Sequence, residues 1–170
     1  RYLKKTGIQV FGYDRTSTAL TDALISEGIE INFEDDAKAI PEVLQKNKTE
    51  VLWIYTPAIP QNSEQKIFLE NSDIEVLKRS EVLELITKQN ICLAVAGTHG
   101  KTTTSTYLAH ILKSNTIHFS ALLGGISSNY NSNYIEHDTG IEIFDKPIIV
   151  IEADEFDRSF HRLNPKAAII

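Results

Sequence analysis

The sequence predicts an α/β protein with parallel sheets in two successive domains, and three observations lead to this prediction. Apolar, strand-like runs alternate with helix-like segments through the first half of the 170-residue chain, which is typical of parallel sheets covered by helices. In the second half, an apolar run ends in a glycine-containing turn with a lysine, at residues 97–104. Another apolar run, at residues 148–151, ends in acidic residues. We expect the domains to cover residues 1–79 and 80–170.

The first expected domain has four strand-like runs. We expect strands at residues 8–13, 29–33, 51–55 and 74–77, and helices at residues 18–27, 36–47 and 62–71. Gly28 stops the first of these helices, and Pro41 predicts an irregular turn in the second. Residues 1–5 look like the end of a helix, without the strand and Gly-rich turn that open a dinucleotide-type fold. We therefore predict a Rossmann-like parallel-sheet domain that lacks its first strand.

The second expected domain is a further α/β unit that contains the glycine turn at residues 97–104. It opens with a helix at residues 80–88, for which Ser80 is a candidate cap. The polar residues 127–134 are typical of either a substrate loop or plain surface. The remaining expected elements are strands at residues 91–96, 119–123, 148–151 and 167–170, and a helix at residues 105–113.

Charge and composition exclude several classes of protein. The chain has 17 basic and 23 acidic residues, a net charge of −6, and no basic cluster, which argues against binding to nucleic acid. No apolar run approaches the roughly 20 residues needed to span a bilayer, so we expect no membrane segment. Cys92 is the single cysteine and cannot form an internal disulfide, which fits a reducing, cytoplasmic location. We expect Cys92 to be a small buried hydrophobe. The oligomeric state stays open.

Residues 97–104 have the order of a phosphate-binding loop: strand, glycine turn, lysine, hydroxyl, helix. In such a loop, backbone N–H groups and the helix N-terminus bind phosphates. Lys101 would reach the β- and γ-phosphates, and the Thr102 hydroxyl would bind Mg²⁺. The common pattern has a glycine where this chain has Val95, so the loop is a shorter variant. A glycine turn with a solvated lysine is the competing interpretation.

Glu152 directly follows the apolar run 148–151, where a P-loop protein holds Mg²⁺ with a carboxylate. One carboxylate, a hydroxyl and phosphate oxygens suffice for this ion, which keeps several of its waters. Asp154, Glu155 and Asp157 belong to the same acidic cluster, and they cannot all be ligands. A solvated loop is the competing interpretation of this cluster.

With these motifs in place, the chain resembles the Mur ligases of peptidoglycan synthesis, and within them the alanine-adding branch. The segments that carry the resemblance occur in family order and are 12–14 (GYD), 55–59 (YTPAI), 97–104 (GTHGKTTT), 123–126 (LGGI), 152–157 (EADEFD) and 159–160 (SF).

The resemblance implies that residues 80–170 are part of a P-loop ATPase α/β domain. It also implies an ATP-dependent ligase with ATP and Mg²⁺ as cofactors. It would join L-alanine to the lactyl carboxylate of UDP-N-acetylmuramate through an acyl phosphate. The residues expected to bind phosphates are Gly97, Thr98, His99, Gly100, Lys101, Thr102 and Thr103. Thr102 and Glu152 would hold the metal, and together with Lys101 they are the expected catalytic residues. The residues expected to bind substrate are Asp14, Thr56, Ala58, Ile59, His99, Gly124, Gly125 and Asn129.

Three rival functions stay open. A murein peptide ligase, which attaches a recycled tripeptide to the same UDP-sugar, has nearly the same loop and acidic motif. A different P-loop enzyme, such as a small-molecule kinase, also fits the loop, and so does a non-catalytic nucleotide-binding module.

For Asp14, a surface turn is as good an interpretation as a nucleotide contact, and we expect His110, His118, His137 and His161 to be structural or exposed. The resemblance implies a third domain, which closes over ATP and the amino acid and lies outside these residues. We therefore expect the 170-residue chain alone to have no ligase activity.

Overall fold

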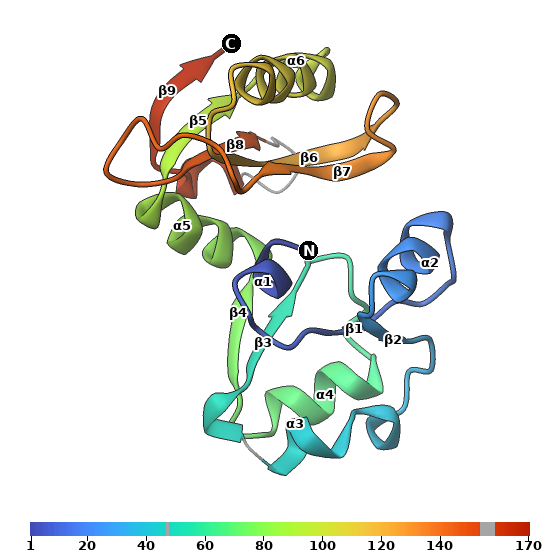
Figure 1. The fold of residues 1–170 in the computed structure, drawn as a ribbon. Helices are drawn as coiled ribbons and strands as arrows, with labels where there is room; N and C mark the ends of the chain where they lie inside the picture. Colours follow the sequence, from blue (N-terminus) through green and yellow to red (C-terminus); the bar gives the residue numbers. More distant parts are fainter. Residues whose placement is uncertain (47, 154–158) are drawn as a thin grey trace. The chain divides into compact units, whose positions relative to one another are not determined.

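The computed structural model describes residues 1–46, 48–153 and 159–170. These residues form two compact units, Arg1–Arg79 and Ser80–Ile170. Both units combine helices with parallel strand pairs, as the ribbon in Figure 1 shows. The predicted α/β class with parallel sheets is therefore confirmed.

The first unit follows the predicted order of strands and helices. Its elements are α1 (Tyr2–Lys5), β1 (Phe11–Tyr13), α2 (Ala19–Ser26), β2 (Glu30–Asn32), η1 (Ala37–Ala39), α3 (Glu42–Lys46), η2 (Lys48–Glu50), β3 (Leu52–Tyr55), α4 (Glu64–Glu70) and β4 (Glu75–Lys78). The helix expected over residues 36–47 is split into the 3₁₀ turn η1 and the short helix α3. Pro41 separates the two pieces, because its ring prevents a continuous helical hydrogen-bond ladder.

The strands of the first unit form two separate parallel pairs, whereas we expected one sheet. β1 pairs with β2, and β3 pairs with β4. β1 and β3 share no neighbouring strand among the described residues, so the expected single sheet is not formed there.

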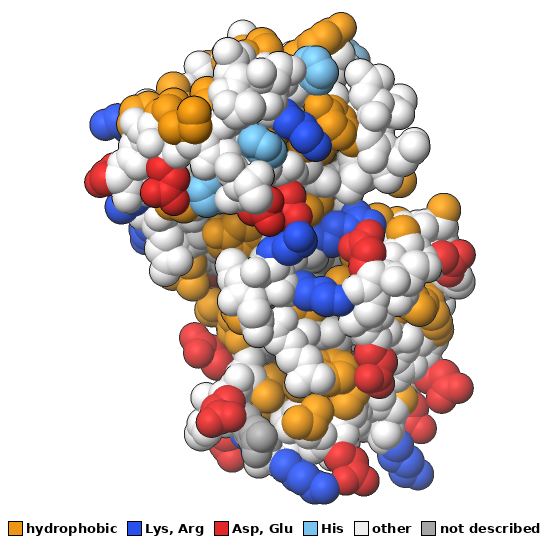
Figure 2. Space-filling view, in the orientation of Figure 1, with side chains coloured by type: hydrophobic (Ala, Val, Ile, Leu, Met, Phe, Trp, Pro, Cys, Tyr) orange, Lys and Arg blue, Asp and Glu red, His pale blue; other side chains and the backbone are white. Residues whose placement is uncertain are grey.

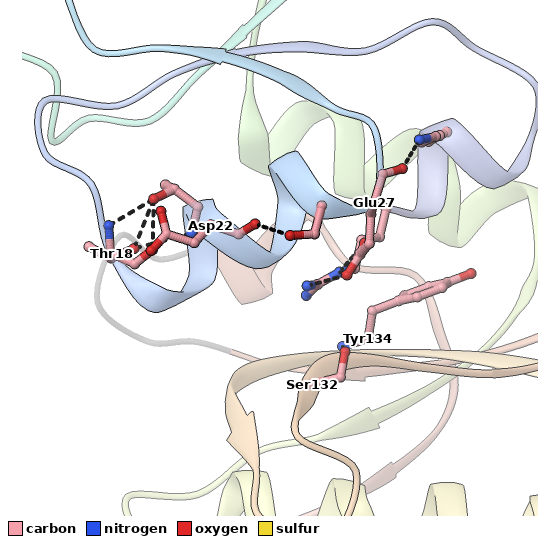
Figure 3. A network of polar contacts seen from close by, with 9 residues as sticks. Thr18, Asp22, Glu27, Ser132 and Tyr134 are labelled. Atoms are coloured by element: carbon pink, nitrogen blue, oxygen red, sulfur yellow. Dashed lines mark hydrogen bonds and ion pairs between the residues drawn. The ribbon is translucent and has the colours of Figure 1, made fainter.

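Helix α2 shows how local sequence sets an element's ends. Thr18 is its N-cap: the Thr18 hydroxyl accepts from the Thr21 amide at 3.3 Å, and the Thr21 hydroxyl accepts from the Thr18 amide at 2.8 Å (Figure 3). This reciprocal capping box satisfies N–H groups that a helix start leaves open. At the other end, Gly28 adopts a φ of +78°, which stops the helix as predicted.

The second unit contains α5 (Arg79–Gln89), β5 (Ile91–Val95), α6 (Lys101–Ser114), β6 (Phe119–Ser127), β7 (Ser132–His137), β8 (Ile148–Glu152), η3 (Ser159–Arg162) and β9 (Pro165–Ile169). One local prediction was wrong: Ser80 is not a cap, because α5 already begins at Arg79 and Ser80 is buried within it. Of the two interpretations left open for residues 127–134, a loop throughout does not hold, because β6 extends to Ser127 and pairs with β7 as an antiparallel hairpin.

A single five-stranded sheet organises the second unit, with the order β7-β6-β8-β5-β9. β5 lies between β8 and β9 and is parallel to both. Helix α6 packs mainly against β6 and β8 (Figure 1). The core beneath it is made of buried side chains from α6 and the sheet: Ala109, Leu112, Phe119, Ala121, Leu123, Ile135, Ile148 and Val150.

Cys92 lies on β5 with no exposed surface, which confirms its interpretation as a small buried hydrophobe. Burial raises the pKa of its thiol to about 11. A thiol with this pKa stays protonated near neutral pH, so Cys92 is a poor nucleophile.

The surface of each unit mixes charges of both signs. Figure 2 shows acidic and basic side chains interspersed over the face that it draws. Among the described residues, no helix combines the length and the apolar character that crossing a membrane requires.

We predict that Ile149→Ala lowers the free energy of unfolding by about 2–5 kcal/mol, because Ile149 has no exposed surface and its truncation leaves a cavity in the sheet core. The matched control is Ile143→Ala, whose side chain is 51% exposed and should cost about 0.5 kcal/mol or less. Urea denaturation of both variants checks this. Equal losses would contradict the assigned core.

Candidate functional site

The phosphate loop occupies residues 96–100, between the end of β5 and the start of α6. Gly97 and Gly100 adopt φ values of +126° and +77°. Glycine enters this left-handed region without the strain that a β-carbon would cause. Val95, at the position where the common loop pattern has its first glycine, is the last residue of β5 and is buried. The shorter loop therefore begins only after the strand has ended.

Helix α6 begins directly at this loop and points its N-terminus into it. Gly100 is the N-cap, and no side chain of the described residues caps this end by a hydrogen bond. The N–H groups of a first helical turn have no partner within the helix, and they carry a partial positive charge. Thr98, His99 and Gly100 are exposed. The loop thus offers accessible N–H groups to an anion.

Lys101 folds back over the loop. Its Nζ donates a hydrogen bond to the Gly97 carbonyl oxygen at 2.7 Å. This contact joins the first residue of α6 to the first glycine of the loop. The ammonium group is therefore held at the loop, where a polyphosphate would need a cation.

Thr102 and Glu152 lie 50 residues apart in sequence and meet in the structure. The Thr102 hydroxyl donates to Glu152 Oε2 at 3.1 Å. Glu152 is the last residue of β8, and not the first residue after the strand as expected; it pairs in register with Val95. Asp154, Glu155 and Asp157 lie outside the described residues. The pairing brings one hydroxyl and one carboxylate oxygen together beside the phosphate loop.

Gly124 and Gly125, near the end of β6, border this Thr102–Glu152 pair. A β-carbon at position 124 would lie 2.8 Å from Glu152 Oε2, and one at position 125 would lie 3.6 Å from the Thr102 hydroxyl. Only the first distance is shorter than ordinary contact. Gly124 therefore leaves the space that the Glu152 carboxylate occupies. The predicted contact of both glycines with a sugar substrate stays a prediction.

A cavity of about 390 Å³ begins at Thr102 and runs along α6. Its lining residues are Thr102, Thr103, Thr106, Tyr107, His110, Ile126, Ser127, Ser128 and Asn129. Asn129, a predicted substrate residue, is therefore in its wall.

The sequence reasoning missed Thr106, Tyr107 and His110 as part of this cavity. The spacing of four between Thr102, Thr106 and His110 places all three on one helix face, and this was the available signal. His110 Nδ1 lies 2.9 Å from the Tyr130 hydroxyl, so its exposed ring has a fixed neighbour.

In the first unit, the predicted substrate residues lie at the carboxyl ends of two strands. Asp14 follows β1, is exposed, and accepts the Thr16 amide at 3.2 Å in a local turn. Thr56, Ala58 and Ile59 follow β3, where the Ile59 amide donates to the Thr56 carbonyl at 3.2 Å. The carboxyl ends of parallel strands are where such sheets bind ligands.

Asp35, after β2, was not predicted as part of any site. Its Oδ1 accepts hydrogen bonds from the Ser63 hydroxyl at 2.8 Å and the Gln65 amide at 3.1 Å. Partial burial on its own would raise the pKa of Asp35, but these hydrogen bonds outweigh it and hold the pKa below its ordinary value. The partners are 28 and 30 residues away, so no local pattern marks this contact.

The chain shares both of its units with known proteins. Residues 1–90 match the catalytic domain of the Mur ligase family, and residues 95–170 match the Mur ligase middle domain. The chain is 50% identical to a UDP-N-acetylmuramate–L-alanine ligase of Christiangramia forsetii and 48% identical to one of Porphyromonas gingivalis. Each match covers all 170 residues of the chain but 36% of the relative.

Solved structures show the same fold. A UDP-N-acetylmuramate:L-alanyl-γ-D-glutamyl-meso-diaminopimelate ligase from Neisseria meningitides matches 99% of the chain with a TM-score of 0.81, at 24% identity and over 54% of its own length. A UDP-N-acetylmuramate–alanine ligase from Thermotoga maritima matches 99% of the chain with a TM-score of 0.76, at 26% identity and over 36% of its length. A family match over more than half of the chain and these folds lead to one conclusion: the chain belongs to the Mur ligase family.

Proposed function

We propose that this chain carries the UDP-sugar-binding and ATP-binding parts of an ATP-dependent ligase that joins L-alanine to the lactyl carboxylate of UDP-N-acetylmuramate. The observation that carries the proposal is the contact of Thr102 with Glu152 beside a glycine loop that ends in Lys101. It combines anion-binding N–H groups, a cation and a pair of hard oxygen donors. Such a set suits a metal-bound nucleotide triphosphate.

The relatives support alanine as the amino acid. The chain spans about a third of their length, and those cited above are named for L-alanine. We place the reaction in the cytoplasm, where ATP and the UDP-sugar would be available.

The residues beside the loop fit Mg²⁺. Oxygen atoms are the donors that this ion prefers, and it accepts few protein ligands when phosphates supply the rest. Thr102 and Glu152 supply one hydroxyl and one carboxylate, in a space that a β-carbon at position 124 would enter. These two residues would hold the ion together with the phosphates. Bound there, Mg²⁺ would neutralise charge on the transferring phosphoryl group.

The chemistry has to bring two anions together. A lactyl carboxylate oxygen attacks the γ-phosphorus, the bond to ADP breaks, and an acyl phosphate forms. The alanine amine then attacks the acyl carbon, loses a proton, and expels inorganic phosphate. Lys101 and the N–H groups of residues 97–103 would offset the repulsion in the first step, because they hold fixed positive charge where negative charge develops.

The substrate residues divide between the two units. We assign Asp14, Thr56, Ala58 and Ile59 to the UDP group, because they follow strands of the first unit at the ligand-binding ends. We assign His99, Gly124, Gly125 and Asn129 to the muramyl part, because Asn129 lines the cavity that begins at Thr102. That cavity has no Asp, Glu, Lys or Arg among the described residues of its wall, which suits the neutral acetamido and hydroxyl groups of the sugar ring.

A tripeptide in place of alanine is the second candidate, since the Neisseria enzyme that shares the fold is named for that substrate. At 24% identity that likeness concerns the fold alone. Competition between L-alanine and L-alanyl-γ-D-glutamyl-meso-diaminopimelate for a full-length ligase that contains this chain decides between them. We expect alanine to be consumed first.

A non-catalytic nucleotide-binding module is the third candidate. Calorimetry of the chain with ATP·Mg²⁺ and with UDP-N-acetylmuramate tests its two binding sites separately. We expect both ligands to bind. Binding of the sugar nucleotide alone would contradict the assigned ATP site.

We predict that Lys101→Ala lowers turnover of a full-length ligase containing this chain by about 100-fold or more, because it removes charge stabilisation from the phosphoryl transfer. The control is Lys113→Ala, in the last turn of the same helix, which should leave turnover unchanged. Steady-state rates of phosphate release measure both. Near-normal turnover of the Lys101 variant would refute the assignment.

We predict that Gly124→Ala raises the dissociation constant of Mn²⁺·ATP by about tenfold, because its methyl group must displace the Glu152 carboxylate from Thr102. The neighbouring Gly125→Ala is the matched control, since its added carbon makes ordinary contact. Calorimetry measures the affinity, and thermal unfolding should change little, because the displaced group is the end of a flexible side chain. Equal affinities of the two variants would contradict the assigned role of Gly124.

A further inference from the structure

The segment after β3 is a short loop with its backbone folded into two successive turns. The Ile59 amide donates to the Thr56 carbonyl at 3.2 Å, and the Ser63 amide donates to the Pro60 carbonyl at the same distance. Residues 56–58 are exposed. We call residues 56–62 the β3–α4 loop. The loop begins where β3 ends. It ends at the first residues of α4, which make contacts with other parts of the unit.

Asp35, in the loop after β2, contacts the beginning of α4. Its Oδ1 accepts from the Ser63 hydroxyl and from the Gln65 amide, while the Gln65 side chain donates to the Glu34 carbonyl at 2.6 Å. Ser63 is 1% exposed and Gln65 is 6% exposed, whereas Asp35 itself lies at the surface. The Ser63 hydroxyl also accepts the Lys66 amide at 3.3 Å, as the N-cap of α4. Asp35 thus completes a shared cap.

A second contact holds the loop from inside α4. Lys66 is 5% exposed, and its Nζ donates to Gln61 Oε1 at 2.9 Å and pairs with Glu70 at 2.7 Å. Gln61 belongs to the β3–α4 loop itself. Two polar contacts, from the buried side chains of Ser63 and Lys66 to the exposed Asp35 and Gln61, therefore hold the loop's carboxyl-terminal end.

We propose that Asp35 is a positioning residue for the UDP group: it fixes the β3–α4 loop so that Thr56, Ala58 and Ile59 are preformed for the ligand. This inference rests on the proposed function, which assigns those three residues to the UDP-sugar. A preformed loop avoids the cost of ordering it on binding. The Asp35 carboxylate acts by accepting hydrogen bonds. Its negative charge is not required for binding of the UDP group.

Two substitutions separate the acceptor oxygen from the charge. Asp35→Ala removes both, and we expect it to raise the KM for UDP-N-acetylmuramate about tenfold in a full-length ligase containing this chain, with kcat and the KM for ATP unchanged. Asp35→Asn keeps an oxygen for Ser63 and Gln65, so its KM should stay within about threefold of the wild type. Asp36→Ala is the control: Asp36 carries the same charge next door and caps η1 through the Lys38 amide, so all three constants should stay unchanged.

The outcomes distinguish this inference from the proposed function. A wild-type ligase that does not use UDP-N-acetylmuramate refutes the proposed function. An active wild type whose Ala and Asn variants at position 35 have equal KM values refutes the role of the acceptor oxygen. An Ala variant with a normal KM refutes the inference altogether. If Asp35→Ala does not fold, Ser63→Ala removes the same hydrogen bond from its other side, and a normal KM in that variant has the same consequence.

Discussion

The in-register parallel pairing of β5 with β8 is the constraint on which the candidate nucleotide site depends. Val95 and Glu152 pair directly, so both strands end at the same level of the sheet. The chain leaves β5 into the phosphate loop and leaves β8 at the acidic residue. A slip of one residue would turn the side chain of Glu152 to the opposite face. The buried side chains of β8, Ile148 to Ile151, show that both faces of this strand are covered up to the polar Glu152.

Glycines shape the site at two levels. Gly97 and Gly100 supply backbone conformations that let a short loop turn from a strand into a helix. Gly124 contributes by having no side chain, since its β-carbon would take the place of the Glu152 carboxylate. The first role is readable from a motif. The second depends on β6 lying beside β8, which the chain specifies only through its tertiary fold.

Much of the fold could be predicted because its signals are local. The capping of α2 by Thr18, the stop at Gly28 and the break at Pro41 involve neighbouring residues. Apolar runs likewise identified the strands that bury their side chains. The hairpin of β6 and β7 was missed because its polar, turn-prone sequence hides an alternation in which Ile135 alone of β7 is buried. The separation of the first unit into two strand pairs follows from pairing between distant residues, which no local pattern reports.

The residues of the candidate site also differ in whether a local sequence pattern marks them. The loop, Lys101, Thr102 and Glu152 could be identified because motif and strand order suffice. Asp35 could not, because its partners lie about 30 residues away at the start of α4. The place of His110 in the cavity wall had a signal in its helical spacing from Thr102, which was overlooked. The assignment of substrate residues to the UDP and muramyl groups stays a prediction.

The central claim is that Thr102 and Glu152 act as one unit on a metal-bound nucleotide, and a double-mutant cycle on the affinity for Mg²⁺·ATP tests it most directly. The variants are Thr102→Ala, Glu152→Gln and the two combined, measured by calorimetry. The account predicts coupling, with the double variant binding no more weakly than the weaker single variant and an interaction energy of about 1 kcal/mol or more. Losses that add to within about 0.5 kcal/mol would contradict it, because independent residues give additive effects.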